Sequence, residues 1–385
     1  MLLIFEIDSS FADRLGELIH CINFVSEDII AVNLLHEHLH VTVADTSEHD
    51  SIIKKIEELI QQFRTSHLQE KVLSESRARE SFSGEEELYD SGLLKKYGSG
   101  LVRLQGKAVE LAHFFDAKFR RIALDLGAVE FLYPVLLPVE TLKKTGYVNS
   151  SPQYLLFVSK LVENTDIFAG LTNAIDNGTI ASLCCSPKHA LSPSACFHCY
   201  ADLSNQKLPS PYVITLKQSV FRNEGRLNFN QIGRLMDYNV REIVFFGDQN
   251  YVLEIRHKIV NAVSRFLEDI GLQGKLNIAY DPFVIPMMQR YKKIQLRDEM
   301  KLELRLSLGK EKDLAAASFN IHGESFSSTF NITIQDIDVV TSGCVGFGLE
   351  RWVIAFLCQF GVDPSKWPEI VTNELIKEVN QPVYL

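Results

Sequence analysis

Apolar and polar residues repeat along this chain with two different periods, and each period predicts a type of element. The apolar positions of Ser51 to Phe63 fall on one stripe of a 3.6-residue repeat, which predicts an amphipathic helix. Residues 111–126 and 251–270 predict two longer helices, and Gly271 is suited to end the second. Residues 301–306 alternate strictly between polar and apolar, as a half-buried strand does.

The order of these elements predicts the fold class. Strands and helices do not follow the regular strand–helix–strand succession of a parallel sheet, so we expect an α+β fold with an antiparallel sheet flanked by helices. Residues 1–70 have the pattern of a small N-terminal α/β domain, residues 71–97 that of a charged linker, and residues 98–385 that of the main domain. Residues 330–340 are rich in Ile, Val and Thr and predict a strand, and residues 352–360 predict a closing helix.

Composition narrows the class of protein. The net charge of −10 argues against extended contact with nucleic acid and so disfavours tRNA as a partner. No run approaches the roughly 20 apolar residues that span a bilayer, and the first residues lack the basic region of a signal peptide. The seven cysteines are scattered without the spacing of a disulfide scaffold. We therefore expect a cytoplasmic protein that does not bind a membrane.

The first candidate for chemistry is Phe221 to Glu224. An arginine on a strand, here Arg222, can bind two phosphate oxygens at once through its planar guanidinium. Glu224, two residues on, would share its strand face and could accept a hydrogen bond from an exocyclic amine. Taken alone, this pair could also be an ordinary surface ion pair on a strand.

The second candidate is the glycine-rich stretch Ser342 to Arg351. Its glycines, Gly348 among them, would let the backbone approach a ligand closely in a turn, and the helix that follows would point its positive end at an anion. Arg351 could then stack on or bind a nucleotide. A glycine-rich turn before a helix is common, so this stretch alone is also compatible with no ligand.

Together the two stretches resemble motifs 2 and 3 of class II aminoacyl-tRNA synthetases, in the order that family has. Residues 133–146 resemble motif 1, whose proline lies at the dimer interface in that family and maps onto Pro134. The resemblance implies a homodimer with an antiparallel catalytic sheet. It also implies an ATP site made of Arg222, Glu224, Gly348 and Arg351, in which Arg222 and Arg351 are the catalytic residues.

A further resemblance concerns a metal. Cys196, Glu242 and Cys344 look like the zinc ligands of amino acid:[carrier protein] ligases, which are truncated homologues of the atypical, zinc-dependent seryl-tRNA synthetases. Three protein ligands leave the fourth position of Zn²⁺ open, where the α-amino group of a substrate could bind. Two alternatives stay open: a zinc knuckle at residues 196–199 with Cys184 and Cys185 nearby, or cysteines that are simply buried small apolar residues.

The resemblance implies an AMP-forming ligase that activates a small amino acid with ATP and Mg²⁺ and loads it onto the phosphopantetheine thiol of a holo-carrier protein. Glu303 and Asn320 would line the amino-acid side. A glutamate that seryl-tRNA synthetases keep just before their Ser/Asn-rich strand has no clear equivalent before Ser318, so Mg²⁺ binding is expected on Glu303 or elsewhere. The alternatives are seryl-type aminoacylation of tRNA, and a degenerate paralogue that only binds.

Overall fold

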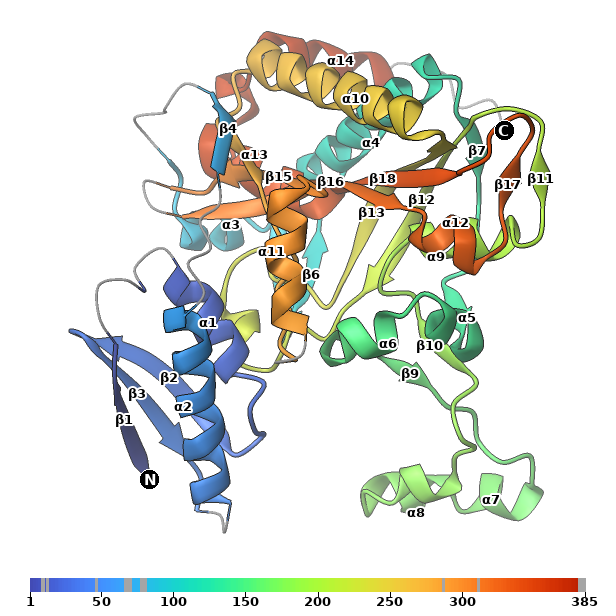
Figure 1. The fold of residues 1–385 in the computed structure, drawn as a ribbon. Coiled ribbons are helices and arrows are strands. Elements are labelled where there is room, and N and C mark those ends of the chain that lie inside the picture. The colour runs from blue at the N-terminus through green and yellow to red at the C-terminus, as the bar shows by residue number, and fades with distance from the viewer. Residues whose placement is uncertain are drawn as a thin grey trace.

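An eight-stranded sheet organises the main part of the chain (Figure 1). The computed structural model describes residues 1–7, 11, 14–45, 48–65, 71–76, 82–285, 288–309 and 312–379. The strand order is β4-β14-β15-β16-β18-β13-β12-β7, and every neighbouring pair is antiparallel except β12 with β7. The strands are β4 (Lys71–Glu75), β7 (Val129–Phe131), β12 (Tyr212–Phe221), β13 (Asp237–Gly247), β14 (Gly274–Ile278), β15 (Lys301–Ser307), β16 (Asp313–Gly323) and β18 (Thr341–Gly348).

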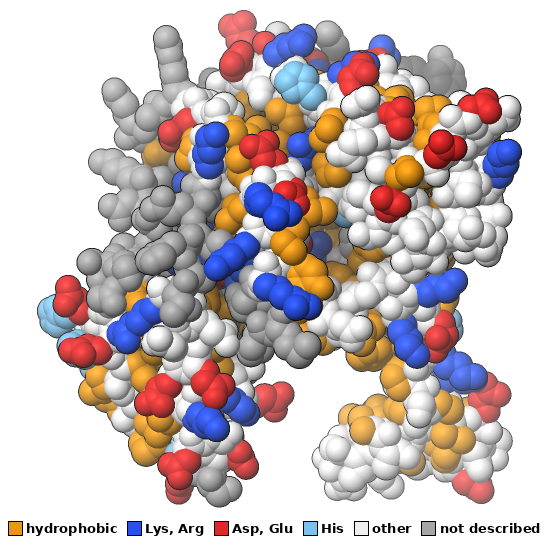
Figure 2. All heavy atoms as spheres, viewed as in Figure 1, with side chains coloured by type: hydrophobic (Ala, Val, Ile, Leu, Met, Phe, Trp, Pro, Cys, Tyr) orange, Lys and Arg blue, Asp and Glu red, His pale blue; other side chains and the backbone are white. Residues whose placement is uncertain are grey.

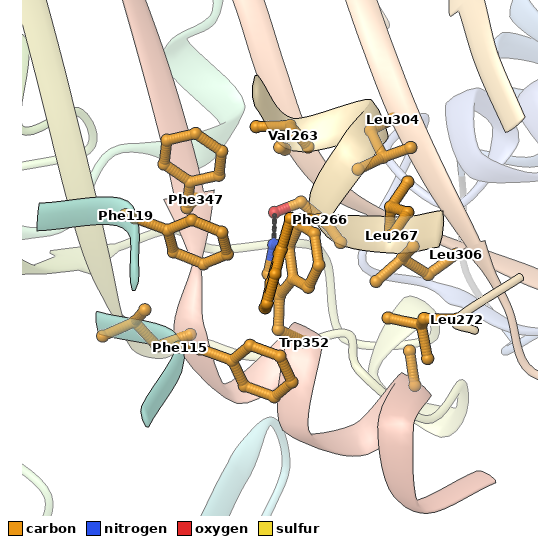
Figure 3. Close-up of a cluster of buried hydrophobic side chains, with 14 of the residues drawn as sticks. Phe115, Phe119, Val263, Phe266, Leu267, Leu272, Leu304, Leu306, Phe347 and Trp352 are labelled. Carbon is orange, nitrogen blue, oxygen red and sulfur yellow. Dashed lines mark hydrogen bonds between the residues drawn. The ribbon is translucent and has the colours of Figure 1, made fainter. Parts of the chain in front are cut away.

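Helices pack on one face of this sheet, which confirms the predicted α+β architecture. They are α4 (Lys107–Asp125), α10 (Gln249–Ile270), α13 (Leu349–Phe360) and α14 (Glu369–Val379). The core between sheet and helices is rich in aromatic rings (Figure 3). Phe119 of α4 stacks on Phe347 of β18 with ring centroids 4.0 Å apart, and the Trp352 indole N–H donates to the Ala316 carbonyl at 3.1 Å. Alternate strand residues point into this core, so their apolar character follows from the sheet's pleat.

The other face of the same strands carries polar side chains. Glu242 of β13 lies opposite Gly346 of β18, Gly346 opposite Ser318 of β16, and Ser318 opposite Glu303 of β15. Because side chains alternate between the faces of a sheet, these positions form one row across it. The candidate residues of the sheet are therefore held on a rigid surface whose reverse side is the hydrophobic core.

The N-terminal part of the chain forms a module of three strands and two helices with its own hydrophobic cluster. Its elements are β1 (Leu2–Glu6), α1 (Leu15–Ile22), β2 (Ile29–Leu35), β3 (His38–Val43) and α2 (His49–Thr65). The module contacts the rest of the chain directly. Tyr280 donates to Glu17 at 2.8 Å, and Asn23 donates to Asn228 at 2.8 Å. We refer to residues 1–65 below as the N-terminal module.

Smaller elements surround the polar face. A hairpin of β5 (Leu94–Gly98) and β6 (Leu101–Leu104) follows α3 (Glu85–Asp90), and a small sheet has the order β8-β10-β9. Figure 1 shows α7 and α8 projecting away from the rest of the chain, and α11 standing in front of the sheet. The elements are β8 (Leu136–Pro138), α5 (Val139–Lys144), α6 (Tyr147–Ser150), β9 (Phe157–Val158), α7 (Thr165–Ala169), α8 (Leu171–Asp176), β10 (His189–Leu191), α9 (Cys196–Asp202), β11 (Lys207–Leu208), α11 (Gln289–Arg297), α12 (Ser325–Thr329) and β17 (Thr333–Ile334). In the part of the chain that the structure describes, no helix has the length and apolar character to cross a membrane.

Three local predictions are wrong. The glycine-rich stretch is not a turn, because residues 341–348 form β18 between two neighbours in the middle of the sheet. The strand expected over residues 330–340 is reduced to the two residues of β17. Arg222 and Glu224 do not share a strand face, because β12 ends at Phe221 and both residues lie in the segment that follows.

Candidate functional site

Two cysteines and a histidine converge on the polar face of the sheet. Cys196 begins α9, Cys344 lies in the middle of β18, and His322 lies near the end of β16. One possible ligand atom from each of the three lies within 4.8 Å of the others, and the Cys344 Sγ and the His322 Nε2 are 3.3 Å apart. Both cysteines are only 3% exposed. Two sulfurs and one imidazole nitrogen are donors that suit Zn²⁺.

Glu242 adds a carboxylate to this group. Its carboxylate and the Cys344 thiol form a hydrogen bond. The space for it depends on Gly346, because a Cβ atom at this position would lie 2.6 Å from the Glu242 Oε2. Of the predicted metal ligands, Cys196 and Cys344 thus lie together with His322, and Glu242 borders this group through Cys344 without being one of the three. We name these four residues the donor cluster.

Burial disfavours the charged forms of three of the four donors, Glu242, His322 and Cys344. A hydrogen bond with Cys196 and burial raise the pKa of the Cys344 thiol well above its usual value. Burial raises the pKa of Glu242 to about 7 against the opposing charge of Arg222, and burial lowers the pKa of His322 to about 4. A bound cation would reverse this balance, because metal binding favours thiolates and a carboxylate. The chemistry of the four donors therefore fits a zinc ion.

The alternative zinc knuckle is not assembled. Cys199 lies on the buried side of α9 and is completely buried in the core. The His198 ring stacks on Tyr133, with the ring centroids 5.8 Å apart. Cys184 and Cys185 lie beyond α8, next to the strand pairing of Leu161. Among the described residues, Cys196, His322 and Cys344 form the only group of three possible metal ligands.

A cluster of arginines surrounds Glu224. The Glu224 Oε2 lies 3.1 Å from the Arg234 Nη1, and its Oε1 lies 3.7 Å from the Arg351 Nη2. Burial alone would raise the pKa of Glu224, but the charges of Arg234, Arg351 and Arg222 outweigh it and hold the pKa below its usual value. The Arg351 guanidinium also lies 4.6 Å from the centroid of the Tyr238 ring. We name Arg222, Glu224, Arg234 and Arg351 the arginine cluster.

Arg222 connects the two clusters. Its Nε donates to the Pro193 carbonyl at 2.9 Å, which directs the side chain back from the end of β12. Its charge acts on both Glu224 and Glu242. Gly348 lies on the other side of the arginine cluster, where a Cβ atom would be 3.2 Å from the Tyr238 ring. The absence of a side chain there leaves room for the Arg351 stem beside the ring.

The two predicted amino-acid-binding residues have different surroundings. The Asn320 amide donates to the Ser318 hydroxyl at 3.2 Å and lies 3.6 Å from the Cys344 Sγ, so it borders the donor cluster. Glu303 lies one strand further along, where Arg305 donates to its Oε2 at 2.7 Å and the Lys301 Nζ is 3.8 Å from its Oε1. A magnesium ion at Glu303 would have to compete with these two cations.

Three residues of the site were missed from the sequence. His322 has a visible signal, because Ser318, Asn320 and His322 alternate along one strand. Arg234 has no such signal, since its partner Glu224 is ten residues away in a loop. Gly346 was expected to serve a turn, and its role as the space for Glu242 depends on the pairing of β13 with β18.

Comparison with known proteins finds similar sequences among serine–tRNA ligases. No family model matches the chain. The type-2 serine–tRNA ligase of Methanococcus aeolicus is 27% identical over 271 residues, which are 67% of this chain and 52% of that protein. The type-2 serine–tRNA ligase of Methanothermobacter thermautotrophicus is 26% identical over 81% of this chain and 64% of its own length. The chain thus spans between half and two thirds of the length of these curated relatives.

Solved structures agree on the fold. The M. kandleri SerRS, in complex with A. aeolicus tRNASec, superposes with a TM-score of 0.72 and 22% identity over 98% of this chain and 77% of that one. The cytoplasmic serine–tRNA ligase of Naegleria fowleri, in complex with AMP, gives a TM-score of 0.62 and 11% identity over 85% of this chain and 71% of that one. None of these relatives supports the expected carrier-protein specificity, and they give no support for disfavouring tRNA. The chain has the class II aminoacyl-tRNA synthetase fold and is similar in sequence to type-2 serine–tRNA ligases.

Proposed function

We propose that this chain activates an amino acid with ATP to form an aminoacyl-adenylate, and that serine is the first amino acid to test. The observation that carries the proposal is that the arginine cluster and the donor cluster adjoin on the polar face of a class II synthetase sheet. Arg222 acts electrostatically on a member of each cluster, Glu224 and Glu242. Such an arrangement supports a reaction in which an amino acid and a triphosphate meet at one point.

The residues of the arginine cluster would act on ATP. The carboxylate of the amino acid would attack the α-phosphorus, and pyrophosphate would leave. Arg222 and Arg351 would neutralise the charge that develops on the phosphates, as preorganised cations do in a partly buried site. Glu224 would accept a hydrogen bond from the adenine amine, with Arg234 holding its carboxylate in place. The missing side chain of Gly348 would let Arg351 lie beside Tyr238, in place to bind the nucleotide.

The donor cluster would act on the amino acid. A zinc ion, when bound by Cys196, Glu242 and Cys344, would offer a coordination position to the lone pair of a substrate amine. Asn320 borders this group, at 3.6 Å from the Cys344 Sγ, and would contact the amino acid there. The pocket would therefore select a free α-amine and fix the neighbouring carboxylate toward ATP. Magnesium would accompany ATP as its counterion.

The acceptor we propose first is tRNA, as in the relatives named above. The likeness to the tRNA-bound M. kandleri enzyme covers 98% of this chain and so extends into the N-terminal module. Lys and Arg side chains also gather over α11, in front of the sheet (Figure 2). Arg290, Lys293 and Arg297 are exposed there. A basic helix beside the site supports the approach of a phosphate backbone despite the net negative charge of the chain.

A carrier-protein thiol is the second candidate acceptor, and one observation favours it. The N-terminal module has 12 Asp and Glu residues against 4 Lys and Arg residues. Such a charge opposes contact between the module and an RNA backbone. Under this proposal the aminoacyl group would pass from the adenylate to the thiol of a phosphopantetheine arm, and AMP would leave.

We also propose a homodimer through the motif 1-like segment. Four apolar side chains around Pro134 are exposed in the single chain, and Leu132 is 89% exposed. The others are Val129, Val135 and Leu136. An exposed apolar strip of this kind is typical of a surface that another subunit covers.

Offering both acceptors to the same enzyme tests the proposal. The protein is incubated with ATP, Mg²⁺, Zn²⁺ and radioactive serine, glycine or alanine, and then with a tRNASer transcript or a holo-carrier protein. Label on the tRNA supports the seryl-type reaction, and label on the holo-carrier supports the second candidate. The apo-carrier, which lacks the thiol arm, is the matched control. If adenylate forms but neither acceptor is labelled, both proposed transfers fail. If no adenylate forms with any of the 20 amino acids, the activation proposal fails as well.

A further inference from the structure

We propose that His322 is a fourth protein ligand of the metal held by Cys196, Glu242 and Cys344 while no amino acid is bound, and that the substrate amine replaces it. The first part concerns only the metal and this chain, whereas the second part rests on the proposed function. Three protein ligands would leave the fourth coordination position of the zinc ion open to water. A fourth protein ligand would occupy that position until a substrate arrives.

The backbone directs His322 into the cluster. In the pairing of β16 with β18, the register shifts between Ile321 and Gly323, so His322 is the extra residue of a β-bulge. A bulge bends its strand and redirects a side chain, and bulges are frequent next to functional sites. Here the imidazole meets Cys344, which lies opposite Asn320, two residues before His322.

The distances fit a shared tetrahedral ion. Two ligands at about 2.0–2.3 Å from a tetrahedral zinc lie roughly 3.3–3.8 Å apart. The His322 Nε2 lies 3.3 Å from the Cys344 Sγ, and the Cys196 Sγ completes a set that spans no more than 4.8 Å. The imidazole and the Cys344 thiol are thus already at the spacing of two ligands of one ion. Cys196 and Glu242 would reach the same ion by turning their side chains toward it, since Glu242 lies outside the three-residue set.

The surroundings of His322 would also let it leave. Within the described residues its ring forms no hydrogen bond other than that with Cys344. Its packing neighbours are aromatic: the Phe326 ring centroid is 4.8 Å away and the Tyr200 ring centroid is 6.2 Å away. The side chain is only partly buried, whereas both cysteines are buried. An imidazole held only by ring contacts and by its interaction with Cys344 can rotate away when an amine binds.

The test is X-ray absorption and cobalt spectroscopy on the intact chain loaded with Zn²⁺ or Co²⁺, without amino acid. Wild type is expected to show two sulfur ligands and the outer-shell scattering of one imidazole. His322→Ala is expected to lose the imidazole signal and to bind the metal at least about tenfold more weakly, because even neighbours of ligands contribute that much. His198→Ala is the matched control, since it removes the imidazole that stacks on Tyr133 rather than reaching Cys344.

Two results would overturn the proposal. One is a wild-type metal with two sulfurs but no imidazole. The other is a folded His322→Ala protein whose spectrum and metal affinity equal those of wild type. His322→Gln, which keeps a polar side chain of similar reach, replaces the alanine variant if circular dichroism shows that it is unfolded. Titration of the cobalt protein with serine then tests displacement: the imidazole signal should disappear. If imidazole binds the metal but no amino acid alters the spectrum, ligation by His322 stands and displacement fails.

Discussion

The arginine cluster and the donor cluster lie beside each other, yet their electrostatic states are opposite. In the arginine cluster the single carboxylate is paired: Glu224 is held by Arg234 and Arg351, and its pKa lies below the usual value. In the donor cluster, burial raises the pKa of Glu242 to about 7, and no protein cation pairs with Cys344 among the described contacts. The arginine cluster thus has an excess of positive charge that suits an anion, whereas the donors of the donor cluster suit a cation.

The two clusters differ in when their charges are stabilised, before a ligand binds or only once it has bound. A paired carboxylate and guanidinium stabilise each other and keep a binding surface ready before the ligand arrives. A buried group of thiols and a carboxylate stays protonated and neutral without metal, and a bound metal replaces those protons. Variants in the donor cluster should therefore change metal binding, variants in the arginine cluster should leave it unchanged, and glutamate variants of the two should have opposite effects on stability.

The largest effect is expected from Cys344→Ser. Replacing a thiolate by a hydroxyl removes the strongest donor class for Zn²⁺, so bound zinc should fall from about one per chain to almost none. Serine-dependent ATP–pyrophosphate exchange should fall at least about 1,000-fold. Inductively coupled plasma mass spectrometry and the exchange assay measure the two effects. Cys358→Ser is the control, because this buried cysteine lies on α13 in the core and should retain zinc. Zinc at wild-type level in Cys344→Ser would contradict the assignment.

The next effect is expected from Arg222→Ala. Loss of a preorganised cation at a developing charge costs about 100- to 1,000-fold in rate. Exchange should therefore fall by that factor while bound zinc stays unchanged. Arg121→Ala is a suitable control, because Arg121 lies on the exposed surface of α4 with Asp125. If Arg222→Ala lost zinc together with activity, the two clusters would not be separable.

A pair of glutamate variants tests the contrast in stability. In the metal-free protein, the raised pKa of Glu242 gives stability that is present below about pH 4.5 and is lost as the pH rises through about 7. Glu242→Gln does not titrate, so between pH 5 and pH 8 its unfolding free energy should gain roughly 3 kcal/mol relative to wild type. Glu224 has a lowered pKa and is ionised throughout this range. Glu224→Gln should therefore cost about 1–3 kcal/mol at both pH values.

Urea unfolding in EDTA at pH 5 and pH 8 measures both glutamate variants. Equal pH dependence of Glu242→Gln and Glu224→Gln would contradict the electrostatic difference between the clusters. Wild type serves as the reference at each pH.

The smallest effect is expected from Gly346→Ala. Its new Cβ would lie 2.6 Å from the Glu242 Oε2, so the carboxylate must move away from Cys344. Displacing one group around a metal site typically costs about 10- to 100-fold in metal affinity. Competition for zinc between the protein and a chelating dye measures the metal affinity. Gly309→Ala, where nothing lies within 4 Å of the new Cβ, should leave the affinity unchanged.

The sequence predicted more of the fold than of the site's geometry. The helix predicted over residues 251–270 and the strand over 301–306 appear as α10 and β15, because a long apolar stripe or a strict alternation specifies a buried face. The glycine-rich residues 341–348 were misjudged, because the sequence does not show that their missing side chains make room for Glu242 and Phe245 on neighbouring strands. His322 was missed as a donor although its alternation with Ser318 and Asn320 is visible in the sequence, because the β-bulge that brings its ring to Cys344 depends on the pairing of two strands.

The most direct measurement of the central claim is amino-acid-dependent ATP–pyrophosphate exchange, run across all 20 amino acids with metal-stripped protein and after zinc is restored. We expect exchange with one small amino acid, serine first, that disappears on stripping and returns with Zn²⁺. Exchange of equal rate in the stripped and restored protein would contradict the role of the donor cluster. Absence of exchange with every amino acid would contradict the proposed activation itself.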